Sequence, residues 1–184
     1  MHAADRPMTT LITAEAIQKR VAELGSQIRE TYFADADREG RERHELTVVG
    51  VLNGSFIFMA DLVRRIDMPL QCDFLGLSSY GSATESSGVV AITKDLSLPI
   101  EGRHVLVVED IIDTGLTMAY LLENLRTRRP ASVKIAALLS KPARRKVEVG
   151  IDFLGFTIAD RFVIGYGLDF DGRYRNLPDI TALD

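Results

Sequence analysis

The fold of this chain is indicated most clearly by residues 107–117, which read Val-Val-Glu-Asp-Ile-Ile-Asp-Thr-Gly-Leu-Thr. An apolar run, typical of a buried strand, ends in two adjacent carboxylates and then a third, and a Thr-Gly-x-Thr turn opens a helical pattern. Backbone N–H groups, a helix N-terminus and two hydroxyls converge in that turn, and its glycine lets the backbone approach a ligand closely. The segment therefore predicts a strand, a phosphate-sized anion site and a helix in succession.

The same alternation extends on both sides of this segment. Short apolar runs at residues 46–52, 104–108 and 133–139 alternate with helical patterns at residues 56–66 and 118–129. This order is typical of a parallel sheet that is covered on both faces. We therefore expect an α/β fold, a Rossmann-like parallel sheet flanked by helices, with the functional residues just after each apolar run.

The two ends of the chain are expected to lie outside this alternation. Apolar residues at steps of four, three and four predict a helix over residues 17–28, and the polar stretch 34–45 predicts a loop. The last part of the chain alternates strand-like pieces with turns. We expect a single domain over residues 1–184, with a core at about 34–150 and a small hood made of the N-terminal segment and about 151–184.

The composition is that of an ordinary globular domain. Of 184 residues, 46% are hydrophobic and 26% are charged, with a formal net charge of −4. The acidic balance argues against a broad nucleic-acid interface, and no apolar run approaches the roughly 20 residues of a membrane-spanning helix. The one cysteine excludes an internal disulfide framework. We therefore expect a cytoplasmic protein with no nucleic-acid and no membrane partner.

The carboxylates of residues 107–117 indicate what is attached to the phosphate. Asp113 must point away from a bound phosphate, because the two negative charges would repel each other. Glu109 and Asp110 can accept hydrogen bonds from paired hydroxyls or hold a divalent cation. Together these features predict a sugar phosphate whose reacting centre lies near Asp113. An acidic strand end with Asp113 or Thr114 as a helix N-cap would explain single residues but not the whole set.

Residues 107–117 resemble the phosphoribosyl-pyrophosphate motif of the type I phosphoribosyltransferases. Further motifs are similar, in the same order, to those of the hypoxanthine-guanine group within that family: LNGSF at 52–56, SYG at 79–81, KP at 141–142 and FVIGYGLD at 162–169. The resemblance implies the type I phosphoribosyltransferase fold. It also implies Mg²⁺-dependent transfer of the 5-phosphoribosyl group from phosphoribosyl pyrophosphate to hypoxanthine or guanine, which gives IMP or GMP and pyrophosphate in purine salvage.

The resemblance also implies roles for residues that contact phosphoribosyl pyrophosphate. It makes Asp113 the catalytic group that exchanges a proton at purine N7. The ribose and 5′-phosphate contacts are implied for Glu109, Asp110, Asp113, Thr114, Gly115, Leu116 and Thr117. Asn53, Gly54 and Arg175 resemble the pyrophosphate contacts. Many members have a basic residue where this chain has Asn53, and the family adopts a cis peptide at Asn53-Gly54.

A second group of residues resembles the family's purine and metal contacts. Lys141 resembles the lysine that donates to the exocyclic O6, and adenine should be rejected because an ammonium offers donors and no acceptor. Phe162 resembles the ring that stacks on the purine, and Val163 the backbone contact to its edge. Asp169 resembles a residue at the purine and a Mg²⁺ ligand, and Glu109 is a second candidate ligand. Ser79 and Tyr80 resemble the start of the lid.

Two other functions remain open at this point. One is a phosphoribosyl-pyrophosphate-sensing, nucleic-acid-binding regulator on the same fold, which would use arginine clusters such as Arg144-Arg145-Lys146; in an enzyme we expect these to be solvated charges. The other is a phosphoribosyltransferase that prefers xanthine. The resemblance also implies a homodimer or homotetramer.

Overall fold

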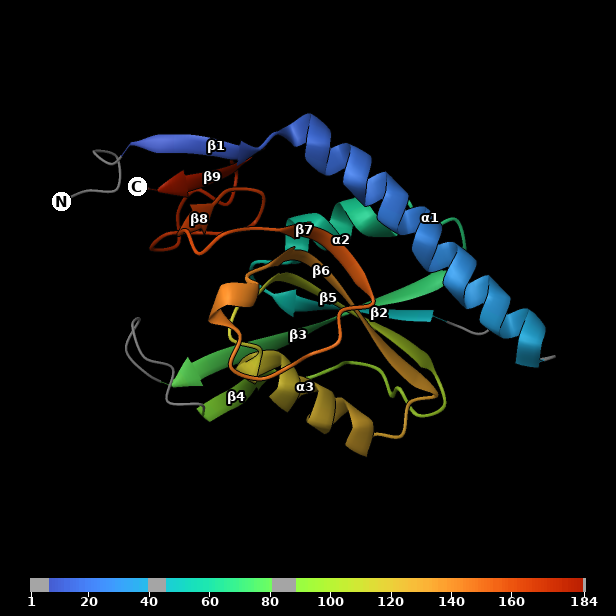
Figure 1. Ribbon diagram of the computed structural model, residues 1–184. Coiled ribbons are helices and arrows are strands. Elements are labelled where there is room, and N and C mark those ends of the chain that lie inside the picture. The colour runs from blue at the N-terminus through green and yellow to red at the C-terminus, as the bar shows by residue number, and fades with distance from the viewer. Residues whose placement is uncertain (1–6, 40–45, 81–88, 184) are drawn as a thin grey trace.

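Figure 1 shows a central sheet with helices on both of its faces. The computed structural model describes residues 7–39, 46–80 and 89–183. Six strands form the larger sheet in the order β4 (Val89–Lys94), β3 (Leu70–Tyr80), β2 (Leu46–Leu52), β5 (His104–Ile112), β6 (Ser132–Ser140), β7 (Phe153–Thr157). Neighbouring strands are parallel, apart from the antiparallel pair of β3 and β4. The expected Rossmann-like parallel sheet is confirmed.

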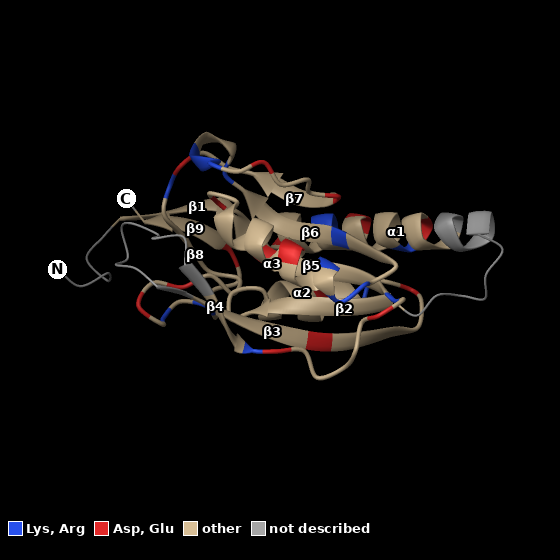
Figure 2. Ribbon diagram, turned by 90° about the horizontal axis from the view of Figure 1, so that it is seen from below, with Lys and Arg blue, Asp and Glu red and all other residues tan. Residues whose placement is uncertain are grey.

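Helices bury the two faces of this sheet. α1 (Ala14–Glu39) and α2 (Phe56–Val63) lie on one face, and α3 (Leu116–Thr127) lies on the other, over the middle of the sheet (Figures 1 and 2). The predicted apolar stripe of α1 is fully buried at Ile17, Val21, Leu24 and Ile28. None of the described helices is long and apolar enough to cross a membrane.

α1 is longer than its sequence pattern predicted. Residues 34–39, expected to be a loop, belong to the helix. The reason is that the buried Tyr32 continues the apolar stripe by one more turn, and no glycine or proline occurs between Tyr32 and Gly40. The core therefore includes α1, which begins well before residue 34.

A second, smaller sheet lies beside the carboxyl ends of the large one (Figure 1). It is antiparallel, in the order β1 (Met8–Ile12), β9 (Ile180–Leu183), β8 (Val163–Ile164). The expected hood began at about residue 151, but β7 extends the large sheet by pairing with β6 and burying Phe153. The smaller sheet thus takes its C-terminal strands from residues beyond β7.

Candidate active site

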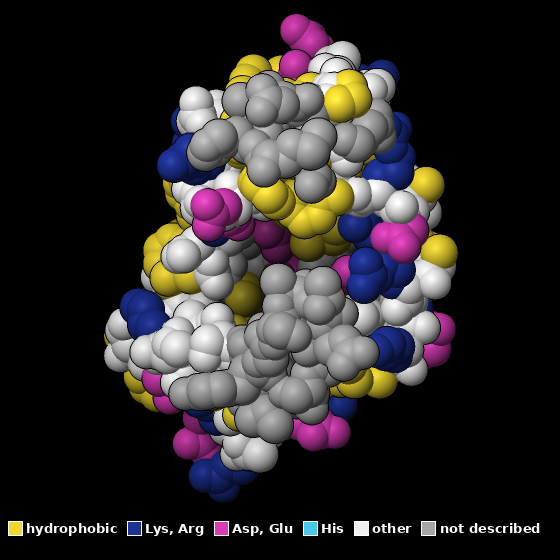
Figure 3. All heavy atoms as spheres, turned by 90° about the vertical axis from the view of Figure 1, so that its left-hand side faces the viewer, with side chains coloured by type: hydrophobic (Ala, Val, Ile, Leu, Met, Phe, Trp, Pro, Cys, Tyr) yellow, Lys and Arg dark blue, Asp and Glu magenta, His cyan; other side chains and the backbone are white. Residues whose placement is uncertain are grey.

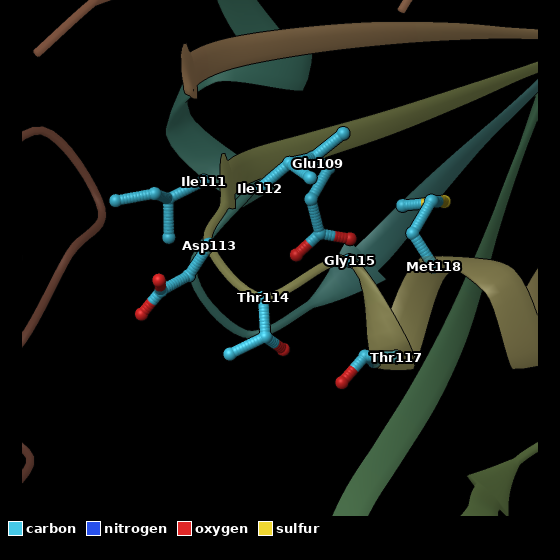
Figure 4. A pocket seen from close by; sticks show the side chains of 8 residues that line it. All are labelled: Glu109, Ile111, Ile112, Asp113, Thr114, Gly115, Thr117 and Met118. Carbon is cyan, nitrogen blue, oxygen red and sulfur yellow. The ribbon is translucent and has the colours of Figure 1, made fainter. Parts of the chain in front are cut away.

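The candidate site lies where the strands of the large sheet end. Figure 3 shows this edge as a hollow between the smaller sheet and the large one, with acidic side chains inside it. A pocket of about 120 Å³ lies at the junction of β5 and α3, and Figure 4 shows the side chains that line it. Its lining consists of Glu109, Ile111, Ile112, Asp113, Thr114, Gly115, Thr117 and Met118.

The loop between β5 and α3 is shaped for an anion. α3 begins at Leu116, and Gly115 precedes it with φ +83°, in the left-handed region that glycine enters without strain. A Cβ at Gly115 would also overlap the carbonyl oxygen of Val147. The Thr114 carbonyl accepts the N–H groups of Lys146 and Val147 at 2.9 and 3.1 Å, which ties the loop to the chain beyond β6. The loop therefore has the strand-turn-helix shape that an anion site requires, and the N-cap of α3 is Gly115 instead of Asp113 or Thr114.

Glu109 and Asp110 form a half-buried acidic pair at the base of the loop, in which the Oε2 atom of Glu109 is fully buried. Burial raises the pKa of Glu109 well above its usual range, and the neighbouring Asp110 raises it further. Burial also raises the pKa of Asp110, although its oxygen accepts the Ile111 N–H at 2.8 Å. Among the described residues, the buried Oε2 atom of Glu109 has no hydrogen-bond partner. The pair consequently fits a ligand that brings hydrogen-bond donors or a cation.

The turn after β2 reaches the same acidic pair. The cis peptide bond joins Leu52 to Asn53, one bond earlier than the resemblance implied for Asn53-Gly54. Gly54 packs against Asp110 so closely that a Cβ would overlap the Asp110 carboxylate. The Gly54 carbonyl in turn packs against Gly167, in the segment after β8. The structure thereby brings the expected pyrophosphate residues of the β2 turn beside the expected ribose residues of β5.

In the segment after β8, Arg175 and Asp169 form an ion pair. Arg175 Nη2 lies 2.7 Å from Asp169 Oδ1, and Arg175 Nη1 donates to the Gly167 carbonyl at 2.6 Å. The other Asp169 oxygen accepts the Gly172 N–H at 2.8 Å. Since Gly167 contacts Gly54, this pair belongs to the segment that packs against the β2 turn.

Lys141 and Phe162 offer two different contacts for a planar ligand. Lys141 directly follows β6, and its side chain is only 7% exposed. Phe162 is 49% exposed, an unusual degree for a large aromatic residue, and its ring meets Phe170 edge to face at 5.6 Å between centroids. The next residue, Val163, is buried in β8. A buried cation and an open aromatic face suit a flat ligand with a hydrogen-bond acceptor.

Asp113 points away from the threonine hydroxyls of the loop. In Figure 4 its carboxylate lies on the far side of the pocket from Thr117. It makes an ion pair with Arg144, with Nε and Oδ1 3.1 Å apart. Arg145 donates to Ser140 Oγ at 2.8 Å. Arg144 and Lys146 are exposed, as expected of solvated charges, but Arg144 and Arg145 also make specific contacts that the sequence did not predict.

Arg144 and Arg145 are residues that the sequence interpretation missed. The available signal was their position, because they closely follow Lys141 at the carboxyl end of a parallel strand. Figure 2 shows the basic turn at this edge of the molecule. For the lid, the side chains of Ser79 and Tyr80 and all of residues 81–88 lie outside what the structure describes.

Comparison with known proteins agrees with this site. The sequence profile of the phosphoribosyl transferase domain family matches residues 9–171. A hypoxanthine-guanine phosphoribosyltransferase of Mycobacterium avium is 50% identical over 176 residues, which are 96% of this chain and 85% of that protein. One of Bacillus subtilis (strain 168) is 49% identical over 94% of this chain and 91% of its own length. The crystal structure of a Staphylococcus aureus hypoxanthine phosphoribosyltransferase superposes with a TM-score of 0.88 at 43% identity, covering 98% of this chain and 93% of its own. This chain therefore belongs to the hypoxanthine-guanine phosphoribosyltransferases of the phosphoribosyl transferase domain family.

Proposed function

We infer that this chain is a purine salvage enzyme that transfers the 5-phosphoribosyl group from phosphoribosyl pyrophosphate to hypoxanthine or guanine. The products are IMP or GMP and pyrophosphate. One observation carries the inference: a loop shaped to hold an anion, two half-buried carboxylates and a buried lysine meet at one edge of the sheet, in a chain half identical to enzymes of that name. Neither a nucleic-acid-binding regulator nor a xanthine-preferring enzyme is supported by the comparisons.

In this proposal the sugar phosphate lies along the loop between β5 and α3. Backbone N–H groups at the start of α3 hold the 5′-phosphate, and the hydroxyls of Thr114 and Thr117 flank it. The ribose hydroxyls donate to Glu109 and Asp110. Such donors stabilise the charged carboxylates, which burial disfavours in the free protein. Displacement at a sugar C1 passes through an oxocarbenium-like state, and nearby carboxylates stabilise its positive charge.

Asp113 is the proposed proton acceptor for the purine. As N9 of the base bonds to C1, the bonding pair of the C1–O bond leaves with pyrophosphate. The proton on N7 passes to an Asp113 carboxylate oxygen. A positioned base of this kind contributes roughly 10²–10⁴-fold in rate. The outward direction of the Asp113 carboxylate supports this role, because it leaves the phosphate loop free for an anion.

The purine lies between Lys141 and the ring of Phe162 in this proposal. The Lys141 ammonium donates to O6, and Phe162 stacks on the base. The backbone of Val163 and the segment with Asp169 contact its edge. An ammonium cannot accept from an amino group, so adenine leaves a buried charge without its partner. Such a mismatch supports discrimination of roughly 10⁴-fold.

Magnesium is the proposed cofactor. Glu109 and Asp110 offer carboxylate oxygens, including the buried Glu109 Oε2 atom, which has no hydrogen bond to any described residue. Asp169, in the segment that packs against the β2 turn, offers further oxygens. Mg²⁺ is commonly held by one or two carboxylates together with substrate phosphates. No cluster of three or more acidic, His or Cys ligands occurs among the described residues, and such a shared site needs none. When bound, the metal would neutralise charge on the departing pyrophosphate.

The lid and the assembly complete the proposal. Ser79 and Tyr80 are the proposed start of a lid, whose role would be to exclude water from the reacting centre. The enzyme assembles as a homodimer or homotetramer in the cytoplasm, which sedimentation and fractionation would test. One solved relative, from Trypanosoma cruzi, was studied for the role of its C-terminal region in oligomeric state and activity.

A steady-state assay tests the function. Phosphoribosyl pyrophosphate and Mg²⁺ are supplied with hypoxanthine, guanine, xanthine or adenine, and nucleotide formation is followed. We expect turnover of hypoxanthine or guanine, none of adenine, and loss of turnover when EDTA removes the metal. Turnover of adenine, or of no base at all, would contradict the proposal.

Two variants test the assigned residues. Lys141→Ala should raise KM for hypoxanthine much more than KM for phosphoribosyl pyrophosphate. Lys146→Ala, which removes an exposed lysine nearby, should leave both unchanged. Asp113→Asn should keep substrate binding and lower kcat. An equal rise of both KM values in Lys141→Ala, or an unchanged kcat in Asp113→Asn, would remove that residue from the mechanism.

A further inference from the structure

Lys141 and Arg144 leave the chain on the same side of one short turn. Residues Pro142–Arg144 form a 3₁₀ turn, and the Arg144 N–H donates to the Lys141 carbonyl at 3.2 Å. In this geometry residues three apart lie above one another, so their side chains project together. The turn therefore places the buried Lys141 ammonium and the half-exposed Arg144 guanidinium close to each other.

Asp160, in the segment between β7 and β8, is shared by these two cations. Its Oδ1 atom lies 3.9 Å from Lys141 Nζ and 3.7 Å from Arg144 Nη1. Lys141 is nearly inaccessible, and a buried ammonium requires a nearby counter-charge. Asp160 supplies that charge from the rim, since its own side chain is 49% exposed.

The same guanidinium reaches Asp113 with its other edge. Arg144 Nε lies 3.1 Å from Asp113 Oδ1, an atom that is buried and makes no hydrogen bond among the described residues. Four charges therefore alternate in a row: the Lys141 ammonium, the Asp160 carboxylate, the Arg144 guanidinium and the Asp113 carboxylate. Two positive and two negative groups leave the row neutral.

We propose that Asp160 and Arg144 are positioning residues that hold the two groups assigned to the base: Asp160 fixes the Lys141 ammonium, Arg144 fixes the Asp113 carboxylate, and their mutual contact couples the two. This inference rests on the proposed function, which assigns Lys141 to O6 and Asp113 to N7. O6 and N7 lie on the same side of a purine, so one rigid unit aligns both contacts at once.

The arrangement also leaves each group able to act. Arg144 is paired with Oδ1 of Asp113, and Oδ2 remains for the purine proton. When Asp113 becomes neutral by taking that proton, Arg144 keeps Asp160 as its counter-charge. The carboxylate of Asp160 likewise continues to balance Lys141 after the ammonium donates to O6. Both cations then share the Asp160 carboxylate, and the row carries one net positive charge.

Kinetics of Asp160→Asn, Arg144→Gln and Arg144→Lys test the proposal. Asp160→Asn should raise KM for hypoxanthine about 5- to 10-fold, because loss of a single ion pair weakens binding by about this factor. KM for phosphoribosyl pyrophosphate should stay within about 2-fold of the parent, since Asp160 acts on the base contact. Arg144→Gln should lower kcat about 10-fold or more, and Arg144→Lys should restore part of it. The double variant should lose less than the product of the two single effects.

Matched controls come from a remote ion pair of the same type. Arg128 Nη1 lies 2.8 Å from Asp95 Oδ1, and both are partly exposed. Asp95→Asn and Arg128→Gln should leave both KM values and kcat unchanged. Equal rises of both KM values in Asp160→Asn, a kcat in Arg144→Gln like that of Arg128→Gln, or multiplicative effects in the double variant would overturn the proposal.

A measurement without turnover separates this proposal from the proposed function. The chain has five lysines, so ¹³C-methylated lysine signals can be assigned by Lys→Arg replacement. Asp160→Asn should move the Lys141 signal of the ligand-free protein, and Asp95→Asn should not. An unmoved signal would overturn the positioning role even in an active enzyme. A moved signal in a protein that turns over no base would support the ion pair and reject the enzymatic function.

Discussion

Replacing Gly54 by alanine tests the contact between the β2 turn and the acidic pair of β5. The added Cβ would overlap the Asp110 carboxylate, so either the carboxylate rotates or the turn moves away. Rotation would break the 2.8 Å hydrogen bond from the Ile111 N–H to Asp110. It would also displace the oxygen that we assign to a ribose hydroxyl. Overpacking of this kind typically costs about 1–3 kcal/mol of stability.

The effect on binding follows from the contact that is lost. A hydrogen bond to a charged group contributes about 1.5–3 kcal/mol, so KM for phosphoribosyl pyrophosphate should rise roughly 10- to 150-fold. KM for hypoxanthine should change much less, because Gly54 lies beside Asp110 and not beside Lys141. The two constants are measured in the steady-state assay, and unfolding in denaturant reports the loss of stability.

Gly150→Ala is the matched control. Gly150 lies outside the left-handed region. Apart from its own backbone and its two chain neighbours, no atom of the described residues lies within 4 Å of the point that an alanine Cβ would occupy, so alanine fits there. It should leave both KM values unchanged and keep or slightly raise stability, by about 0.4–1 kcal/mol at most. If Gly54→Ala kept KM for phosphoribosyl pyrophosphate within about 2-fold of the parent, the close approach of Gly54 to Asp110 would have no part in substrate binding.

Three further changes probe other contacts. Asp73→Asn should lower the free energy of unfolding at pH 7 by about 1–3 kcal/mol. Burial raises the pKa of Asp73, but hydrogen bonds from the N–H groups of Phe74, Ser97 and Leu98, together with the Lys94 charge, outweigh burial and lower the pKa overall. The ionised carboxylate therefore stabilises the fold fully at pH values above the ordinary aspartate pKa. In unfolding experiments at different pH, the difference between the variant and the parent should vanish as the pH falls below about 4. Glu109→Gln should stabilise the ligand-free protein by about 1–2 kcal/mol, because it removes a buried charge, yet raise KM for phosphoribosyl pyrophosphate; lower stability in denaturant would refute this. Tyr166→Phe should cost about 1–2 kcal/mol, because its hydroxyl donates to Asp61 at 2.7 Å, whereas Tyr120→Phe on the exposed face of α3 should cost almost nothing in the same experiment.

The candidate site was predictable where its residues are neighbours in the chain. Residues 109–117 place carboxylates, hydroxyls and a glycine between a strand and a helix, and the structure has that strand, loop and helix. Asp113 was expected to face away from the phosphate on grounds of charge repulsion, and its carboxylate lies away from the threonine hydroxyls of the loop. Local sequence suffices here because the loop's shape depends on a few consecutive backbone angles.

The partners of these residues were not predictable. Nothing in the sequence indicates that Arg144 contacts Asp113, or that Asp160 faces both Lys141 and Arg144. The approach of Gly54 to Asp110 joins the ends of β2 and β5, which are far apart along the chain. Such contacts depend on which strands become neighbours and on the side chains that then meet at their ends.

The strands and helices themselves illustrate the same division. Strands β2, β5 and β6 and helix α1 were predictable from the spacing of apolar residues along the chain. Spacing is informative because strands and helices each repeat their side-chain directions at a fixed interval. The spacing of apolar residues does not predict that β7 pairs with β6, or that β1 pairs with β9, which lies at the opposite end of the chain. Those pairings bury surface between distant segments, and their free energy exists only once the tertiary fold has brought the segments together.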